Sequence, residues 1–186
     1  MNNTNEIRTT TGTLSTKRLV ICGLFAAILC ISAYLSIPTP LPMAPKITLM
    51  NFMVLLIGLL FPLSESLLIG FTWFLLGIIG LPVFVGGGSG IGYLMAPYGA
   101  YTWAFPIVLA LLPLIRGKEY NRIRYTICAV VGVVVIDVIG MLYLMAVMHY
   151  NLQTAFLTGF VPFIPLDAVK AVVVAQIIPA LRRVTE

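Results

Sequence analysis

Long apolar stretches separated by short polar segments make up the chain from about residue 17 onward. Most are close in length to the roughly 20 residues that a helix needs to cross the ~30 Å hydrocarbon core of a bilayer. The pattern predicts membrane-spanning helices at about residues 18–37, 47–61, 64–80, 98–115, 124–148 and 161–182. We therefore expect an all-α integral membrane protein with six transmembrane helices.

Residues 1–16 differ from the rest of the chain. They are rich in Thr and Asn and have no apolar periodicity, which predicts a disordered N-terminal tail. Residues 17–186 then form a single six-helix membrane domain. A signal peptide has a shorter apolar core and a small-residue cleavage site, so we interpret residues 18–37 as the first helix.

Composition supports a membrane protein. The chain is 60% hydrophobic and only 9% charged, with a mean hydropathy of +1.06, whereas soluble domains are about 25% charged. The net charge of +5 comes from short basic clusters between apolar stretches, not from a basic face interleaved with aromatic residues. We therefore expect the lipid bilayer, and no nucleic acid, as a partner.

The positive charges also predict the orientation. With the N-terminus in the cytoplasm, the opposite side receives only Lys46. The cytoplasmic side receives Arg8, Lys17, Arg18, Arg116, Lys118, Arg122, Arg124, Arg182 and Arg183. Because cytoplasmic loops carry an excess of Lys and Arg, both termini are expected to be cytoplasmic in a multi-pass protein of a bacterial-type cell membrane.

Three connections then face outward. Residues 38–46 are dense in proline, residues 81–97 form a long glycine-rich loop, and residues 149–159 form the third connection. Long loops are usually functional or disordered, and the second is too apolar for disorder. We interpret the first two as a lid over an outward-facing pocket.

Asp167 and Lys170 stand inside the last apolar stretch, where a charge near the bilayer centre costs at least ~2.5–3.5 kcal/mol. Their spacing of three places both on one helix face, toward the bundle interior. Structural explanations also remain open. Asp167 follows Pro165 in a first helical turn, where an acid complements the helix dipole. Lys170 lies at nearly the depth of Asp137 in the fifth span, so these two can form an interhelical pair.

Residues 86–92 have the sequence Gly-Gly-Gly-Ser-Gly-Ile-Gly. This run is neither a P-loop nor a dinucleotide fingerprint, because no Gly-Lys-Ser/Thr follows and no strand–helix unit surrounds it. It is either a flexible turn at the membrane surface or a loop whose bare backbone approaches a small ligand. Its place on the same side as the upper end of the last helix favours the second interpretation.

Catalytic chemistry has little support in the sequence. His149 is the only histidine, and Cys22, Cys30 and Cys128 have no CxxC spacing, so neither a metal site nor Ser/His catalysis is predicted. We expect no cofactor and no enzymatic activity. An intramembrane enzyme remains a distant alternative.

Small residues mark one side of the first predicted helix. Gly23 and Ala27 are four positions apart, as are Ala26 and Cys30 one step round. Such pairs permit close approach of another helix. Contact within the fold and docking of a partner membrane protein both remain open.

Two segments match patterns of a known family. Residues 80–92, Gly-Leu-Pro-Val-Phe-Val-Gly-Gly-Gly-Ser-Gly-Ile-Gly, are followed by Pro97, Gly99 and Tyr101, and residues 163–171 have the sequence Phe-Ile-Pro-Leu-Asp-Ala-Val-Lys-Ala. They resemble the third loop and the Phe-Leu-Pro-Gly-Asp-x-x-Lys-Ala pattern of the BioY biotin transporters. Weaker matches at residues 24–27 and 47–49 extend the resemblance over about residues 17–183.

The resemblance implies the substrate-binding, or S, component of an energy-coupling factor (ECF) vitamin transporter with biotin as its ligand. Asp167 suits the ureido N–H groups of biotin, and Lys170 suits its ureido oxygen or its valerate carboxylate. Loop aromatic residues would cover the apolar part of the ligand. The implied binding residues are Asp167, Lys170, Phe84, Gly86, Gly87, Ser89, Gly90 and Tyr93.

The family also implies partners. These are a transmembrane coupling protein and two ABC ATPases, which dock on the face formed by Gly23, Ala26 and Ala27. The chain has no ATPase motif of its own, so only those partners would use ATP. A solitary biotin transporter is an alternative. Differences from the family pattern at residues 50, 61–63 and 96–101 leave open another small carboxylate vitamin, such as lipoate.

Overall fold

The computed structural model describes residues 15–37 and 47–185. These residues are mainly helical, and two short strands pair with each other. In chain order the elements are α1 Thr16–Ser32, β1 Ser36–Ile37, β2 Ile47–Thr48, α2 Met50–Leu60, α3 Leu63–Ile78, α4 Gly90–Met95, the 3-10 helix η1 Pro97–Trp103, α5 Ala104–Ile115, α6 Arg122–Met148, α7 Leu152–Gly159 and α8 Ile164–Thr185.

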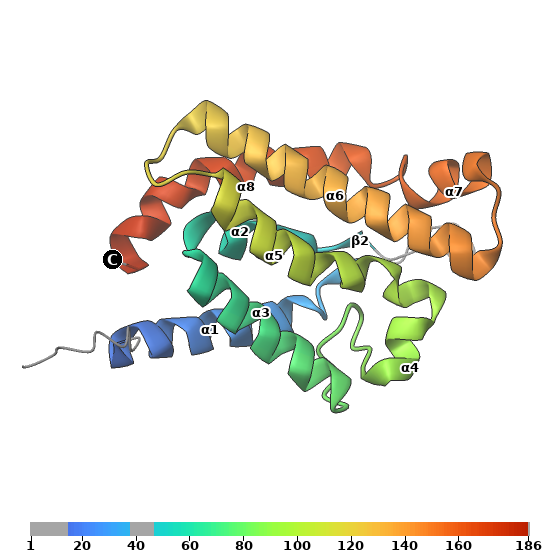
Figure 1. Cartoon of the computed structure of the whole chain (residues 1–186), viewed down its shortest axis with the longest axis horizontal. Helices are drawn as coiled ribbons and strands as arrows, with labels where there is room; N and C mark the ends of the chain where they lie inside the picture. The colour runs from blue at the N-terminus through green and yellow to red at the C-terminus, as the bar shows by residue number, and fades with distance from the viewer. Residues whose placement is uncertain (1–14, 38–46, 186) are drawn as a thin grey trace, which may run out of the picture.

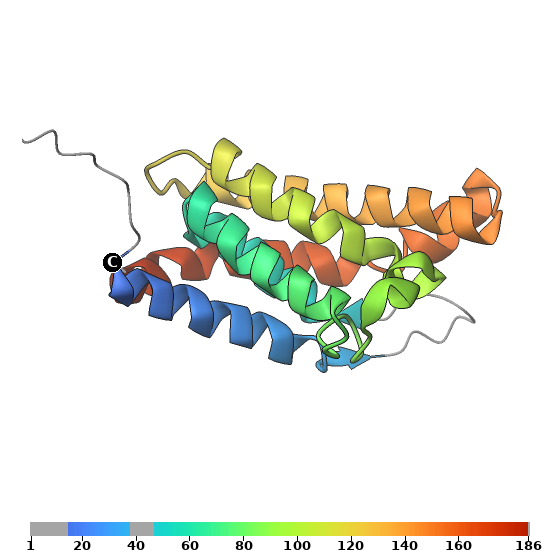
Figure 2. The same ribbon diagram turned by 60° about the horizontal axis from the view of Figure 1, so that its bottom comes forward.

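The longer helices form one bundle (Figure 1 and Figure 2). α6 packs along α8 and α1 packs along α3, while α2 contacts α5 and α8 in the interior. The start of α1, the α2–α3 turn, the α5–α6 link and the end of α8 lie at one end of the bundle, and α4 and α7 lie toward the other. Both ends of the described chain are therefore at the same end.

α2 is the central helix. All of its residues except Phe52 are buried, because a helix that is apolar on every side is stable only when other helices surround it. α2 ends at Leu60 because Pro62 follows shortly after it. Proline lacks an N–H and restricts the residue before it, Phe61, to an extended backbone. The position of α2 matters for function because its first turn carries Asn51 into the interior.

The predicted helical fold class is confirmed. α6 and α8 are each long and apolar enough to cross a membrane, over Arg122–Met148 and Ile164–Arg183. The segments Met50–Leu60, Leu63–Ile78 and Gly99–Ile115 are apolar but shorter. The number of spans and the placement of the termini stay predictions.

The first predicted span ends earlier than expected. α1 stops at Ser32 instead of residue 37, and the chain turns into β1, where Ser36 pairs with Thr48 of β2. This pairing joins the two ends of the predicted lid segment 38–46. That segment itself, like residues 1–14 of the predicted tail, lies outside the described residues.

The other two predicted outward loops contain helices. Residues 149–159 were predicted as a plain connection but hold α7, whose Asn151 side chain accepts a hydrogen bond from the Thr154 N–H at 2.8 Å. Asn is a preferred N-cap residue, so a signal for this helix was present. Residues 81–97 hold α4, and the predicted span 98–115 begins as η1 before it becomes α5.

Candidate functional site

Asp167 lies in the first turn of α8 and is 1% exposed. Its N–H donates to the Phe163 carbonyl at 2.9 Å, which starts the helix. Pro165 suits this first turn, because its missing N–H has no partner to lose there. α8 packs against α2 and α6, so the buried carboxylate belongs to the bundle interior.

Two side chains donate hydrogen bonds to this carboxylate. Lys170 Nζ donates to Asp167 Oδ1 at 2.6 Å, and Asn51 Nδ2 donates to Asp167 Oδ2 at 3.1 Å. Lys170 Nζ also donates to the Thr48 carbonyl at 2.8 Å. The predicted common face of Asp167 and Lys170 is thus confirmed, and the pair joins α8 to α2 and to β2. We call Asn51, Asp167 and Lys170 the polar cluster.

Lys170 does not pair with Asp137, and the interhelical pair that equal depth suggested is wrong. The ammonium of Lys170 is one turn from Asp167 on the same helix, and Asp167 and the Thr48 carbonyl already hold it. Asp137 is 1% exposed, and within residues 15–37 and 47–185 neither of its carboxylate oxygens has a hydrogen-bond partner. It lies within electrostatic range of Asp167 and Lys170.

Asn51 was missed by the sequence reasoning. It is 6% exposed, and its Oδ1 has no hydrogen-bond partner in the part of the chain that the structure describes. Buried polar atoms are normally satisfied, so this acceptor and the two of Asp137 are places where a ligand donor is favoured. A lone amide in an otherwise apolar helix was the available signal.

Tyr101 closes one side of this region. Its hydroxyl donates to the Gly159 carbonyl, its ring lies 5.5 Å from that of Phe163, and it packs on Gly140 of α6. A Cβ at Gly140 would lie 2.2 Å from the Tyr101 ring, so only glycine permits this contact. Tyr101 thereby links η1 to α6 and to the segment that leads into α8.

The glycine loop has the backbone that its sequence suggested. Gly86, Gly87 and Gly90 have φ values of 72°, 79° and 78°, a region that residues with a side chain rarely adopt. The Gly86 N–H donates to the Ala33 carbonyl at 2.7 Å, which ties the loop to the end of α1. Ser89 precedes α4, and its side chain makes no capping hydrogen bond.

Phe84 and Tyr93 hold this loop in place. Phe84 is fully buried, and its ring centroid lies 5.4 Å from that of Trp73 and 5.5 Å from that of Tyr93. The Tyr93 hydroxyl donates to the Val85 carbonyl at 3.2 Å. These contacts pack the loop against α3 and against itself. A role of the loop residues in ligand binding stays a prediction.

The small residues of α1 divide between two surfaces. Gly23 and Ala27 are exposed, and within the described residues no atom lies within 4 Å of a Cβ built on Gly23. Ala26 is 6% exposed and belongs to the core. The structure therefore assigns Ala26 to packing within the fold, and Gly23 and Ala27 to the free surface.

Comparison with known proteins identifies the family of this chain. The model of the BioY family matches residues 3–186. The chain belongs to the BioY family. The resemblance seen in residues 80–92 and 163–171 is therefore confirmed.

Curated BioY proteins align with most of the chain. The probable biotin transporter BioY of Pyrococcus horikoshii is 35% identical over 159 residues, which cover 85% of this chain and 91% of that protein. The biotin transporter BioY of Thermotoga maritima is 32% identical over 168 residues, which cover 90% and 96% of the two chains.

A solved structure has the same fold. It is the S-component for biotin from an ECF-type ABC transporter, with a TM-score of 0.79 and 25% sequence identity. The similarity covers 92% of this chain and 95% of that chain. BioY membership makes the chain a membrane protein of a transporter family.

Proposed function

We propose that the protein takes up biotin as the membrane-embedded S component of an ECF-type transporter. The observation that carries this function is the buried polar cluster inside a BioY-family helical bundle. A charged pair buried in so apolar a chain is expected to have a function, because its burial is costly. Recognition of a polar ligand is such a function.

The chemistry of biotin fits these groups. Its ureido ring has two N–H donors and one carbonyl acceptor, and its tail ends in a carboxylate. Asp167 and Asn51 Oδ1 can accept from the ureido N–H groups, and Lys170 can donate to the ureido oxygen or to the tail carboxylate. The glycine loop lies at the end of the bundle opposite the termini. With Phe84 and Tyr93, it would cover the apolar part of the ligand from that side.

The topology we propose has six spans, with both termini in the cytoplasm of a bacterial-type cell. The common end of the described termini supports an even number of crossings. Large apolar side chains are exposed on several helices, including Phe71 at 67%, Ile127 at 57% and Val169 at 61%. Apolar surface of this extent is expected to contact lipid. Lid segments 38–46 and 81–97 would then face outward.

Energy for uptake comes, in this proposal, from partner subunits. A transmembrane coupling protein and two ABC ATPases would form the energising module, because the sequence has no ATPase motif. The exposed Gly23 and Ala27 of α1 would let a partner helix approach closely.

Uptake of labelled biotin tests the proposal. Cells without their own biotin transporter would express the chain with and without the energising module. We expect concentrative biotin uptake that excess lipoate does not inhibit, and we expect it to require the module. Uptake of lipoate instead of biotin would assign the second vitamin, and full uptake without the module would assign a solitary transporter.

A further inference from the structure

A pocket of about 560 Å³ lies at the end of the bundle that holds both described termini, away from the polar cluster. Its charged residues are Arg18, Arg116, Lys118, Arg182 and Glu65, an excess of three positive charges. Its apolar residues include Leu60, Phe61, Pro62, Leu63, Pro113 and Leu114. We call this site the basic pocket.

Arg116 is the unusual residue of the basic pocket. It is 8% exposed, yet among the described residues it forms no ion pair. Its guanidinium donates to neutral groups, the Tyr125 hydroxyl at 2.7 Å and the Phe61 carbonyl at 3.0 Å, and its Nε has no partner in the described chain. A buried cation without a counter-charge is costly. The site therefore favours an anion.

A second guanidinium lies beside the same tyrosine. Arg182 also donates to the Tyr125 hydroxyl, and the Cζ atoms of Arg116 and Arg182 lie 5.9 Å and 5.3 Å from the same ring centroid. Two like charges held at one ring repel each other, and an anion between them or beside them lowers that repulsion. Phosphate oxygens suit paired guanidinium groups.

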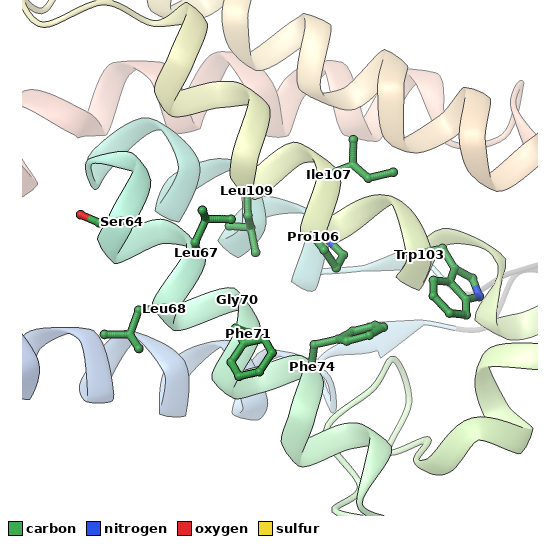
Figure 3. A pocket seen from close by; sticks show the side chains of 10 residues that line it. All are labelled: Ser64, Leu67, Leu68, Gly70, Phe71, Phe74, Trp103, Pro106, Ile107 and Leu109. Atoms are coloured by element: carbon green, nitrogen blue, oxygen red, sulfur yellow. The ribbon is translucent and has the colours of Figure 1, made fainter.

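Apolar surface begins next to the basic pocket. A groove of about 710 Å³ follows α3 and α5 from Ser64, beside Leu63 and Glu65 of the basic pocket, to Trp103 (Figure 3). Its residues include Leu67, Phe71, Phe74, Pro106 and Ile107, and Phe71 is 67% exposed. We call this surface the apolar groove. It has the composition of a contact with a hydrocarbon chain.

We propose that the basic pocket binds the phosphate of an anionic phospholipid, with an acyl chain along the apolar groove. Charge complementarity commits the site to an anionic headgroup, and the apolar groove that begins beside it commits it to a lipid over a free phosphate. Basic pockets between transmembrane helices bind acidic headgroups in this way. The site is separate from the polar cluster, so this inference does not depend on biotin binding.

Lipid retention tests the proposal. The protein would be reconstituted in nanodiscs of equimolar phosphatidylglycerol and phosphatidylcholine, extracted in mild detergent, and analysed by native mass spectrometry. We expect phosphatidylglycerol to be enriched among the retained lipids. Because a direct ion pair at an exposed side chain contributes up to about 1 kcal/mol, loss of a Lys118–phosphate contact in Lys118→Gln should lower the enrichment by as much as about five-fold, and Arg116→Gln should lower it at least as much.

Arg122→Gln is the matched control. It removes the same charge at the same end of the bundle, but Arg122 is exposed and outside the basic pocket, so the enrichment should not change. Lys118 is also exposed, and its substitution leaves the core intact even if Arg116→Gln does not fold. An equal loss in Lys118→Gln and Arg122→Gln would overturn the specific site.

Two further measurements distinguish a bound lipid from a free anion and from a partner protein. Long-chain phosphatidylglycerol should raise the melting temperature in detergent, whereas glycerol phosphate at the same concentration should not. Equal stabilisation by both would show a free-anion site and overturn the lipid proposal. If Lys118→Gln leaves lipid retention unchanged but abolishes co-purification with the energising module, the pocket is a protein contact and the lipid proposal is wrong.

Discussion

Asn51 of α2 donates a hydrogen bond of 3.1 Å to Asp167 of α8, although 116 residues separate the two in the chain. Lys170 adds a second link, because its ammonium bridges Asp167 and the Thr48 carbonyl of β2. β2 is the strand that follows residues 38–46. A ligand that replaces the Thr48 carbonyl as a partner of Lys170 would therefore break a contact that holds β2, the strand next to the predicted lid segment.

Asn51→Leu should weaken biotin binding. The substitution removes a hydrogen bond to a charged buried group and also the free Oδ1 acceptor, a loss of about 1.5–3 kcal/mol, or roughly 10- to 150-fold in Kd. Calorimetric titration measures it. Gln176→Leu is the control, since Gln176 lies farther along α8 and bonds to Thr126. An equal loss in both variants would show a general effect on helix packing.

Lys170→Met should destabilise the protein by about 3–5 kcal/mol, because the buried Asp167 carboxylate loses its cation. Adding Asp167→Asn should recover much of that loss. Unfolding in denaturant, with a double-mutant cycle, measures the coupling. The same cycle between Lys170 and Asp137 should give under about 1 kcal/mol, since the two make no direct contact. A larger coupling to Asp137 than to Asp167 would contradict the structure.

Gly77→Ala should lower thermal stability. A Cβ at Gly77 would lie 2.1 Å from the ring of Phe84, which is fully buried beside Trp73. Overpacking of this kind costs about 1–3 kcal/mol. Gly92→Ala is the matched control, because in the part of the chain that the structure describes no atom lies within 4 Å of its Cβ position. If the two melting temperatures agree, Phe84 does not hold the loop as described.

Gly23→Leu should spare biotin binding and weaken assembly with the energising module. Gly23 is exposed on α1 and its Cβ position is open among the described residues, so the larger side chain extends outward and blocks close approach of a partner helix. Co-purification with the module, together with biotin titration, measures both effects. Ala26→Leu should instead lower thermal stability, because Ala26 is in the core. Equal co-purification of Gly23→Leu and wild type would remove the docking role.

Much of the fold follows from the sequence because apolar length and proline positions are local signals. The helical class and the shared face of Asp167 and Lys170 were predicted on that basis. The partner of Lys170 was not, since depth along two helices specifies height but not the direction in which a side chain points. Asp137 has the right height, yet Asp167 is one turn away on the same helix and holds the ammonium.

Asn51 is a second residue whose long-range partner the sequence does not specify. A single amide in α2 was visible in the sequence, but its partner is on α8 and nothing local points to it. The helix α7 was missed for a different reason. It has only 8 residues, too few to show a clear helical period, and only the Asn151 cap marks its start. Long-range hydrogen bonds and short capped helices are therefore what the structure adds.

Calorimetric titration of the purified protein with biotin shows whether the polar cluster binds this vitamin. We expect nanomolar binding to the wild type, and a loss of about 2 kcal/mol or more, roughly 30-fold in Kd, in each of Asp167→Ala and Lys170→Ala. No binding of biotin by the wild type, or unchanged affinity in both variants, would contradict biotin binding by the polar cluster.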